Sequence, residues 1–240
     1  MDFENFKEEF IRKLNRIEIN LDNNQLEEFY KYMCLLIEWN EKMNLTAIIE
    51  PKEIILKHFI DSLTILNEIE DKNTLIDIGT GAGFPGIPLK IAKPNLKVVL
   101  LDSLNKRILF LNEVINKLEL ENIETIHARV EDIGKNIKYR EKFEIVTSRA
   151  VANLAILSEY MIPLTKIGGK CICMKGSSIK DEINESQKAI NLLGGKVEKI
   201  DEFVLPSTDI KRNIIVIKKE KSTPKNFPRK AGIPSKNPIN

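Results

Sequence analysis

The chain has 240 residues, 42% of them hydrophobic and 30% charged, which is the composition of an ordinary globular protein with a core of its own. Three cysteines are too few for a disulfide framework, so the sequence favours a reducing, cytoplasmic setting. No apolar run approaches the ~20 residues that span a bilayer, and the charged start MDFENFKEEF is unlike a signal peptide.

Charge is unevenly distributed along the chain. Residues 211–240 contain nine Lys or Arg and one acid, Glu220, so they carry +8, while the remaining 210 residues carry −6 of the net charge of +2. A basic end on an acidic body indicates a tail that meets a polyanion. The alternative is a solvated tail without a partner.

The first 70 residues are predicted to be helical. Asp22 and Gln25 form a potential capping box for one helix. A second helix is predicted to open at Pro51. The expected buried positions are Leu26, Phe29, Tyr30, Met33, Leu36 and Ile37 in the first helix and Ile54, Ile55, His58 and Phe59 in the second. This block, 1–70, is interpreted as a helical extension that packs on the core.

From residue 74 onward, short β-rich runs alternate with helical segments. The predicted strands are 74–78, 97–102, 123–128, 143–148, 169–175, 196–205 and 213–219. This alternation is typical of an α/β protein with a mainly parallel sheet and helices on both faces. The last two strands leave no room for a helix between them and are expected to pair antiparallel. We predict one domain over 71–220 and a basic, Pro-rich tail over 221–240.

The stretch LIDIGTGAGFPGIP at 75–88 places four glycines in the first strand-to-helix turn, where doubly wound sheets bind nucleotides. Gly81, Gly83 and Gly86 match the dinucleotide pattern GxGxxG, with Asp102 about twenty residues further on. Asp77 argues against a pyrophosphate, because like charges repel. An acid there suits the cationic sulfonium and ammonium of S-adenosylmethionine, which we therefore predict as cofactor. Asp102 can accept from ribose hydroxyls in either case.

The glycine turn and the GFPGIP within it resemble the bacterial family of small-subunit rRNA guanine-N7 methyltransferases, also called glucose-inhibited division protein B. Further stretches, in the family's order, are similar to its signatures: WNEKMNLTAI at 39–48, HFIDSL at 58–63, SRAVA at 148–152 and PRKAGIPSKNP at 228–238. The resemblance covers almost the whole chain. Thr80 and Phe227 depart from it, standing where Ser and Tyr are expected.

The resemblance implies a class I S-adenosylmethionine-dependent methyltransferase with a seven-stranded sheet, acting as a cytoplasmic monomer on a guanine in the decoding region of 16S rRNA. It implies that Gly79 and Phe84 line the cofactor pocket, that Val130 and Glu131 flank the adenine, and that Arg149 lies near the methionine end or the incoming base. The predicted cofactor-binding residues are Asp77, Gly79, Gly81, Gly83, Phe84, Asp102, Ser103, Leu104, Val130, Glu131 and Arg149.

Guanine N7 carries a lone pair and no proton, so its methylation needs alignment rather than a general base. The sequence shows no convincing catalytic pairing around its two histidines and no metal-ligand spacing, so we predict neither a catalytic acid or base nor a metal. The predicted RNA-binding residues, which would contact phosphates of 16S rRNA or the small ribosomal subunit, are Lys175, Arg229, Lys230 and Lys236. Three alternatives stay open: an NAD(P)-dependent oxidoreductase, a methyltransferase for a non-RNA substrate, and a non-catalytic RNA-binding protein.

Overall fold

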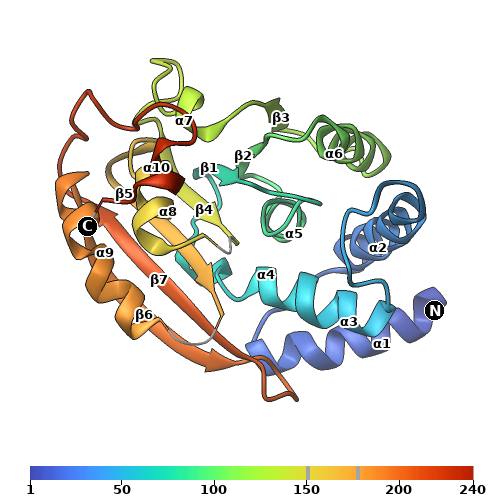
Figure 1. Cartoon of the computed structure of the whole chain (residues 1–240). Coiled ribbons are helices and arrows are strands. Elements are labelled where there is room, and N and C mark those ends of the chain that lie inside the picture. Colours follow the sequence, from blue (N-terminus) through green and yellow to red (C-terminus); the bar gives the residue numbers. More distant parts are fainter. Residues whose placement is uncertain (150–151, 177–178, 240) are drawn as a thin grey trace.

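Seven strands form one sheet in the order β3-β2-β1-β4-β5-β7-β6, with helices on both faces (Figure 1). The computed structural model describes residues 1–149, 152–176 and 179–239. β1 to β5 pair parallel, whereas β7 runs antiparallel to both β5 and β6; the pairing of β6 with β7 was predicted. The strands are β1 Thr74–Ile78, β2 Lys97–Asp102, β3 Ile123–His127, β4 Phe143–Ser148, β5 Thr165–Lys175, β6 Gly195–Val204 and β7 Lys211–Lys219.

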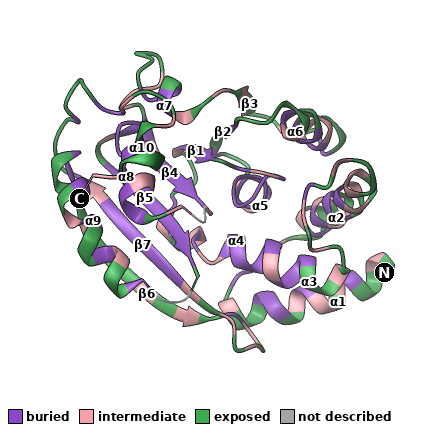
Figure 2. Ribbon diagram, viewed as in Figure 1, coloured by how far each residue is buried: buried purple, intermediate pink, exposed green. Residues whose placement is uncertain are grey.

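The sheet separates two hydrophobic cores. Alternate side chains of a strand point to opposite faces, so in β1 Leu75 joins one core while Ile76 and Ile78 join the other. The first core lies under the N-terminal helices and under α5 Gly86–Ala92 and α6 Asn105–Lys117. The second lies under α8 Leu154–Met161 and α9 Lys180–Leu192. Figure 2 shows the central strands buried and the outward helix faces exposed. Cys171 and Cys173 are fully buried in the second core.

The predicted N-terminal helices are present as α1 Phe3–Leu14, α2 Asn23–Met43 and a helical run made of α3 Pro51–Ile54, a π-helical turn Ile55–Ile60 and α4 Asp61–Leu63. The capping box between Asp22 and Gln25 is formed. Two of the positions expected to be buried in α2, Tyr30 and Ile37, are only partly buried. Tyr32 is fully buried instead, because the helix face that contains it meets the glycine turn. Short 3-10 turns span Asn15–Ile17 and Leu66–Glu68.

The C-terminal segment, residues 221–239, packs against the sheet domain instead of extending from it. The Arg140 guanidinium donates to the backbone oxygens of Gly134, Thr223, Pro224 and Phe227 at 2.6–3.2 Å. The Phe227 side chain is 8% exposed and joins the second core. The segment ends in the short helix α10 Ile233–Lys236, which lies against α8 (Figure 1). Just before α10, the Gly232 N–H donates to Glu131 in α7 Val130–Ile133. Within the described part of the chain, no helix is long and apolar enough to cross a bilayer.

Candidate cofactor and acceptor sites

The glycine turn presents bare backbone at the carboxyl end of β1. Gly79 and Gly81 have φ of +66° and +63°, a conformation that strains any residue with a Cβ. The Gly79 N–H donates to the Leu101 carbonyl at 2.8 Å, and the Gly81 N–H donates to Asp102 Oδ2 at 2.9 Å. Nothing lies within 4 Å of the place where a Gly79 Cβ would be. β2 therefore holds the turn from behind, and its free side is open to a ligand.

Gly83 and Gly86 are needed for packing. A Cβ at Gly83 would lie 2.6 Å from both the Tyr32 hydroxyl and Ile87 Cδ1, and one at Gly86 would lie 2.4 Å from Leu100 Cδ2. Only the first half of the turn is therefore open to a ligand. Its second half is bare so that α2 and β2 can pack close to α5.

Asp77 lies beneath the turn and is fully buried. Its Oδ2 accepts from the Thr80 hydroxyl at 2.6 Å and from the Gly86 N–H at 2.9 Å, whereas its Oδ1 has no partner among the described atoms. Burial raises the pKa of Asp77 to about 7, although both hydrogen bonds lower it. The attraction predicted between this acid and a cationic cofactor would thus act across the turn and not by direct contact.

A first cavity of about 230 Å³ lies beside the turn, at the carboxyl ends of β1, β2 and β4. Five of the predicted cofactor residues line it together: Gly79, Asp102, Ser103, Val130 and Glu131. The opposite wall includes Leu157 and Tyr160 of α8, which the sequence analysis missed, because their helical spacing is that of ordinary core positions. The other predicted cofactor residues do not line the first cavity: Asp77, Gly81, Gly83, Phe84, Leu104 and Arg149.

Asp102 organises the floor of the first cavity. Its Oδ1 accepts from the Leu104 N–H at 2.9 Å, while its Oδ2 accepts from the Gly81 N–H and from Arg107 Nη1 at 3.1 Å. A carboxylate has about four lone-pair positions, so one remains for a ligand hydroxyl. An acid at the end of the second strand of such a sheet is where ribose hydroxyls bind.

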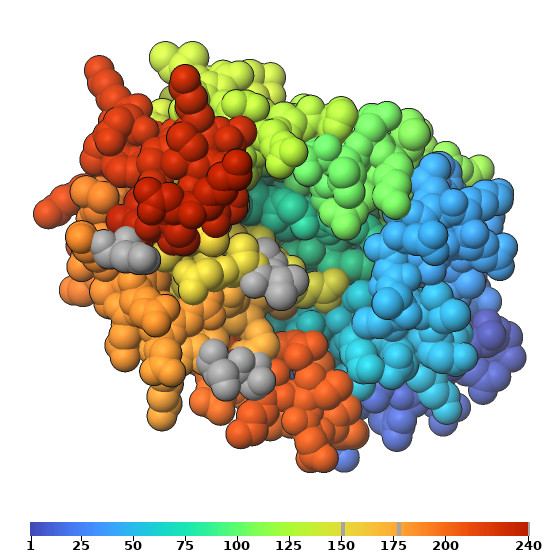
Figure 3. Space-filling view, in the orientation of Figure 1, coloured from blue at the N-terminus to red at the C-terminus, as the bar shows by residue number. Residues whose placement is uncertain are grey.

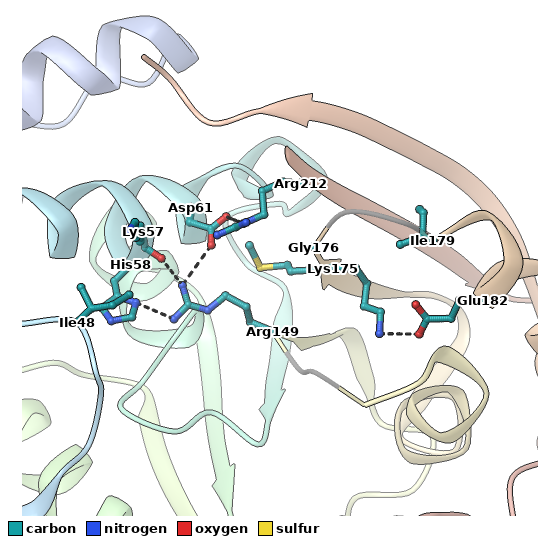
Figure 4. Close-up of a pocket in the computed structure, with 11 residues that line it drawn as sticks. Ile48, Lys57, His58, Asp61, Arg149, Lys175, Gly176, Ile179, Glu182 and Arg212 are labelled. Atoms are coloured by element: carbon teal, nitrogen blue, oxygen red, sulfur yellow. Dashed lines mark hydrogen bonds and ion pairs between the residues drawn. The ribbon is translucent and has the colours of Figure 1, made fainter. Parts of the chain in front are cut away.

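A second cavity, of about 510 Å³, lies on the other side of the turn, between the ends of β4, β5 and β7 and the N-terminal helices (Figure 4). Arg149, directly after β4, projects into it toward Lys57, His58 and Asp61, as Figure 4 shows. The helical extension, predicted to pack on the core, therefore also contributes residues to a cavity. The cavity contains four cationic side chains, Lys57, Arg149, Lys175 and Arg212, and two carboxylates, Asp61 and Glu182.

His58 and Arg149 form one hydrogen-bonded unit. Arg149 donates through Nη1 to the Lys57 carbonyl at 2.9 Å and through Nη2 to His58 Nδ1 at 3.1 Å. Because a guanidinium only donates, Nδ1 is the acceptor and the ring proton is on Nε2, which contacts the Thr46 hydroxyl at 3.0 Å. Burial, followed by the Arg149 charge, lowers the pKa of His58 to about 3, so the ring is neutral.

The ring of Phe84 connects this unit to the glycine turn. It stacks on His58 with centroids 4.4 Å apart, and the Arg149 guanidinium lies 4.9 Å from its centre. Phe84, predicted to line the cofactor pocket, is thus placed between the turn and the second cavity.

Asp61 joins two arginines from distant parts of the chain. Its Oδ1 accepts from Arg212 Nε at 3.0 Å, and its Oδ2 lies 3.5 Å from Arg149 Nη1. Asp61 is 2% exposed, so the carboxylate is buried, whereas both arginine side chains are partly exposed. Asp61 lies in the HFIDSL stretch, but the sequence predicted no role for it. Nothing in the neighbouring sequence indicates a role for Arg212, because its partner Asp61 lies 151 residues away.

Two of the predicted RNA-binding residues have partners inside the protein. Lys175 is 7% exposed and lies 2.7 Å from Glu182, and Arg229 is paired with the buried Glu159 at 2.6 Å. Lys230 and Lys236 are exposed, as a contact to phosphates requires. Within the described residues, no three His, Cys, Asp or Glu side chains gather as metal ligands would.

The sheet order with its antiparallel end, the glycine turn after β1 and the acid at the end of β2 define a class I S-adenosylmethionine-dependent methyltransferase. A similar fold is found in TYW2 of M. jannaschii, whose structure is a complex with AdoMet: the TM-score is 0.54 at 13% identity, over 66% of this chain and 74% of that one. The putative transferase PH0793 of Pyrococcus horikoshii matches with a TM-score of 0.55 at 12% identity, over 68% and 63% of the two chains. At such identities these likenesses show the fold alone.

Sequence comparison gives the family. The model of rRNA small subunit methyltransferase G matches residues 25–215. The ribosomal RNA small subunit methyltransferase G of Acetivibrio thermocellus is 59% identical over 92% of this chain and 91% of its own length, and that of Clostridium beijerinckii is 53% identical over 92% and 93%. The chain therefore belongs to the rRNA small subunit methyltransferase G family. The predicted activity, S-adenosylmethionine-dependent methylation of ribosomal RNA, is confirmed, and the oxidoreductase alternative is excluded.

Proposed function

We propose that this protein transfers a methyl group from S-adenosylmethionine to N7 of a guanine in the decoding region of 16S rRNA. The cofactor binds in the first cavity, with its ribose on Asp102 and its adenine between Val130 and Glu131. Bare backbone at Gly79 allows the methionine part to approach the turn. The cofactor supplies the electrophilic methyl group, and the protein supplies position.

The acceptor guanine enters the second cavity. Arg149 lines this cavity and touches the ring of Phe84, which in turn belongs to the glycine turn. The positive excess of the cavity suits a nucleotide with its phosphates. Guanine N7 in a duplex faces a deep groove that side chains do not reach, so the target must come from a loop or be turned out of its stack.

The observation that favours N7 as the acceptor atom is that each acid and base lining the second cavity already has a protein partner. His58 contacts Arg149 and Thr46, Asp61 lies between two arginines, and Glu182 accepts from Lys175 and the Leu154 N–H. Methylation of a hydroxyl or an exocyclic amine requires a group that removes a proton. N7 presents its lone pair directly, so a cavity with no available base is sufficient for it.

The finer assignments complete the proposal. The exposed Lys230 and Lys236 contact RNA phosphates, whereas Lys175 and Arg229, with their internal partners, stabilise the site. The protein acts as a monomer, without a metal, and in the cytoplasm, where its rRNA substrate is assembled into subunits.

Transfer of a labelled methyl group tests the proposal. The acceptors are small ribosomal subunits from cells that lack the enzyme, naked 16S rRNA, and a sample without RNA, and the product is digested to nucleosides. We expect 7-methylguanosine from one or both RNA acceptors and no label without RNA. A label on another atom of guanosine, or on another nucleoside, would contradict the assignment of N7.

A further inference from the structure

Two carboxylates connect the wall of the first cavity to the C-terminal segment. Glu131, in α7, lines the cavity, is 3% exposed, and accepts through Oε1 from the Gly232 N–H at 2.9 Å. Glu159, in α8, is fully buried and accepts from the Arg229 backbone N–H at 2.8 Å and from its guanidinium at 2.6–3.1 Å. Figure 3 shows the C-terminal residues seated directly against the residues of α8.

The packing between the segment and α7 is tight as well. A Cβ on Gly134, at the end of α7, would lie 2.8 Å from Pro228 Cγ, so α7 and the segment fit without spare room. The segment also has three exposed lysines, Lys225, Lys230 and Lys236. It therefore meets the cofactor cavity wall through its buried contacts and presents these lysines, its basic face, to solvent.

We propose that the C-terminal segment couples the two ligands of the reaction, so that a bound cofactor strengthens binding of RNA to the segment, and the reverse. This inference rests on the proposed function, because it takes RNA as the partner of the basic face. The cofactor would contact Glu131 and Tyr160 and thereby restrict α7 and α8. Both carboxylates are then held in the geometry that the segment requires, and the RNA meets a segment that is already ordered.

Such coupling is reciprocal and measurable as a ratio of affinities. The dissociation constant for naked 16S rRNA is measured without and with saturating S-adenosylhomocysteine, which occupies the cofactor site without reacting. In the wild type we expect RNA to bind about fivefold tighter with the ligand present. A ratio of one in the wild type would overturn the proposal.

The matched variant is Arg229→Lys, which keeps the positive charge at this position but loses the two-pronged pairing with Glu159. We expect its ratio to fall below twofold while its affinity for RNA alone changes little. Arg12→Lys is the control, because Arg12 pairs with Glu9 on the far N-terminal helix and should keep the wild-type ratio. An unchanged ratio in Arg229→Lys would show that the pairing of Arg229 with Glu159 does not couple cofactor binding to RNA binding.

Amide hydrogen exchange of the wild type, without RNA, separates this inference from the proposed function. S-adenosylhomocysteine should slow exchange of the Gly232 N–H about fivefold, since that N–H donates to a carboxylate on the cavity wall. If neither naked 16S rRNA nor small ribosomal subunits bind but exchange slows, the RNA assignment fails and the link between cavity and segment stands. If exchange is unchanged, the link itself is refuted.

Discussion

At the scale of single residues, Asp77 has the most unusual environment. It is fully buried, uses one oxygen twice and leaves Oδ1 unpaired among the described atoms. An ionised carboxylate in such a place is stabilised by little except Thr80 and Gly86, and its pKa is correspondingly raised to about 7. Asp77 thus holds the turn together, and its contribution to the free energy of unfolding depends on pH.

The sign of that dependence follows from linkage. The folded state retains a proton on Asp77 up to about pH 7, whereas the unfolded chain releases it near the ordinary value of 3.8. The contribution of Asp77 to the free energy of unfolding therefore falls as pH rises from about 4 to about 7. Asp77→Asn cannot titrate, so we expect its stability relative to wild type to improve from pH 5 to pH 8. Urea unfolding at the two pH values measures this.

A stability difference between Asp77→Asn and wild type that is the same at pH 5 and pH 8 would contradict the assigned pKa. At pH 8 the same variant should also bind S-adenosylmethionine more weakly, because it lacks the negative charge across the turn from the sulfonium. Titration calorimetry of both proteins at pH 8 checks this second consequence with no RNA present.

At the scale of elements, α2 supports the glycine turn from outside the sheet domain. The Tyr32 hydroxyl donates to the Ala82 carbonyl within the turn, and its ring packs on Phe59 and Phe84. The Tyr32 hydroxyl, together with Ile87, also leaves no space for a side chain at Gly83. The N-terminal helices are therefore part of the machinery that shapes both cavities.

Tyr32→Phe removes only this hydroxyl and leaves a buried carbonyl without its donor. We expect the free energy of unfolding to fall by about 1–2 kcal/mol, the penalty for such a group, and cofactor affinity to fall with it as the turn loosens. Chemical denaturation and calorimetry measure the two effects. Tyr30→Phe is the control, because its hydroxyl donates to the Met1 carbonyl at 3.1 Å in an exposed place, and it should change stability by less than about 0.5 kcal/mol. Equal effects of the two variants would contradict a specific role for Tyr32.

At the scale of the whole molecule, the C-terminal segment packs back onto the sheet domain. The C-terminal segment returns across the sheet domain and inserts Phe227 into the second core, 8% exposed. Lys219 supports this closure, since its ammonium donates to the Ile162 carbonyl at 2.7 Å and to the Thr223 hydroxyl at 2.6 Å. Residues that looked like an appendage thus complete the fold.

Phe227→Ala tests that closure. Removing a buried aromatic ring typically costs about 3–5 kcal/mol, and we expect a loss of about 3 kcal/mol in the free energy of unfolding. Ile233→Ala in the same segment is the control, because Ile233 is 40% exposed and its loss should cost less than about 1 kcal/mol. A Phe227→Ala loss below about 1 kcal/mol would mean that the segment is a detachable tail.

The elements themselves were predictable because their signals are local. Alternating apolar runs predicted all seven strands, and β5 differs mainly in beginning at Thr165, four residues earlier, where it pairs with Phe143 ahead of a bulge. Asp22 and Gln25 predicted a helix start through contacts three residues apart. The glycine turn and Asp102 likewise lie in sequence where the geometry of β–α units requires them. Ala150 and Val151 of the SRAVA signature lie outside the described residues.

What the sequence alone determined was the order of strands and helices, the glycine turn and, through several motifs, the family. Only the tertiary structure decided which charged side chains are free to contact a ligand such as RNA. Lys175, Arg229 and Lys230 look alike in sequence, yet Lys175 is paired with Glu182 and Arg229 with the buried Glu159, whereas Lys230 faces solvent. The physical reason is range: backbone propensity acts over a few residues, whereas the pairing of Asp61 with Arg212 joins positions 151 residues apart that meet only after the sheet has formed.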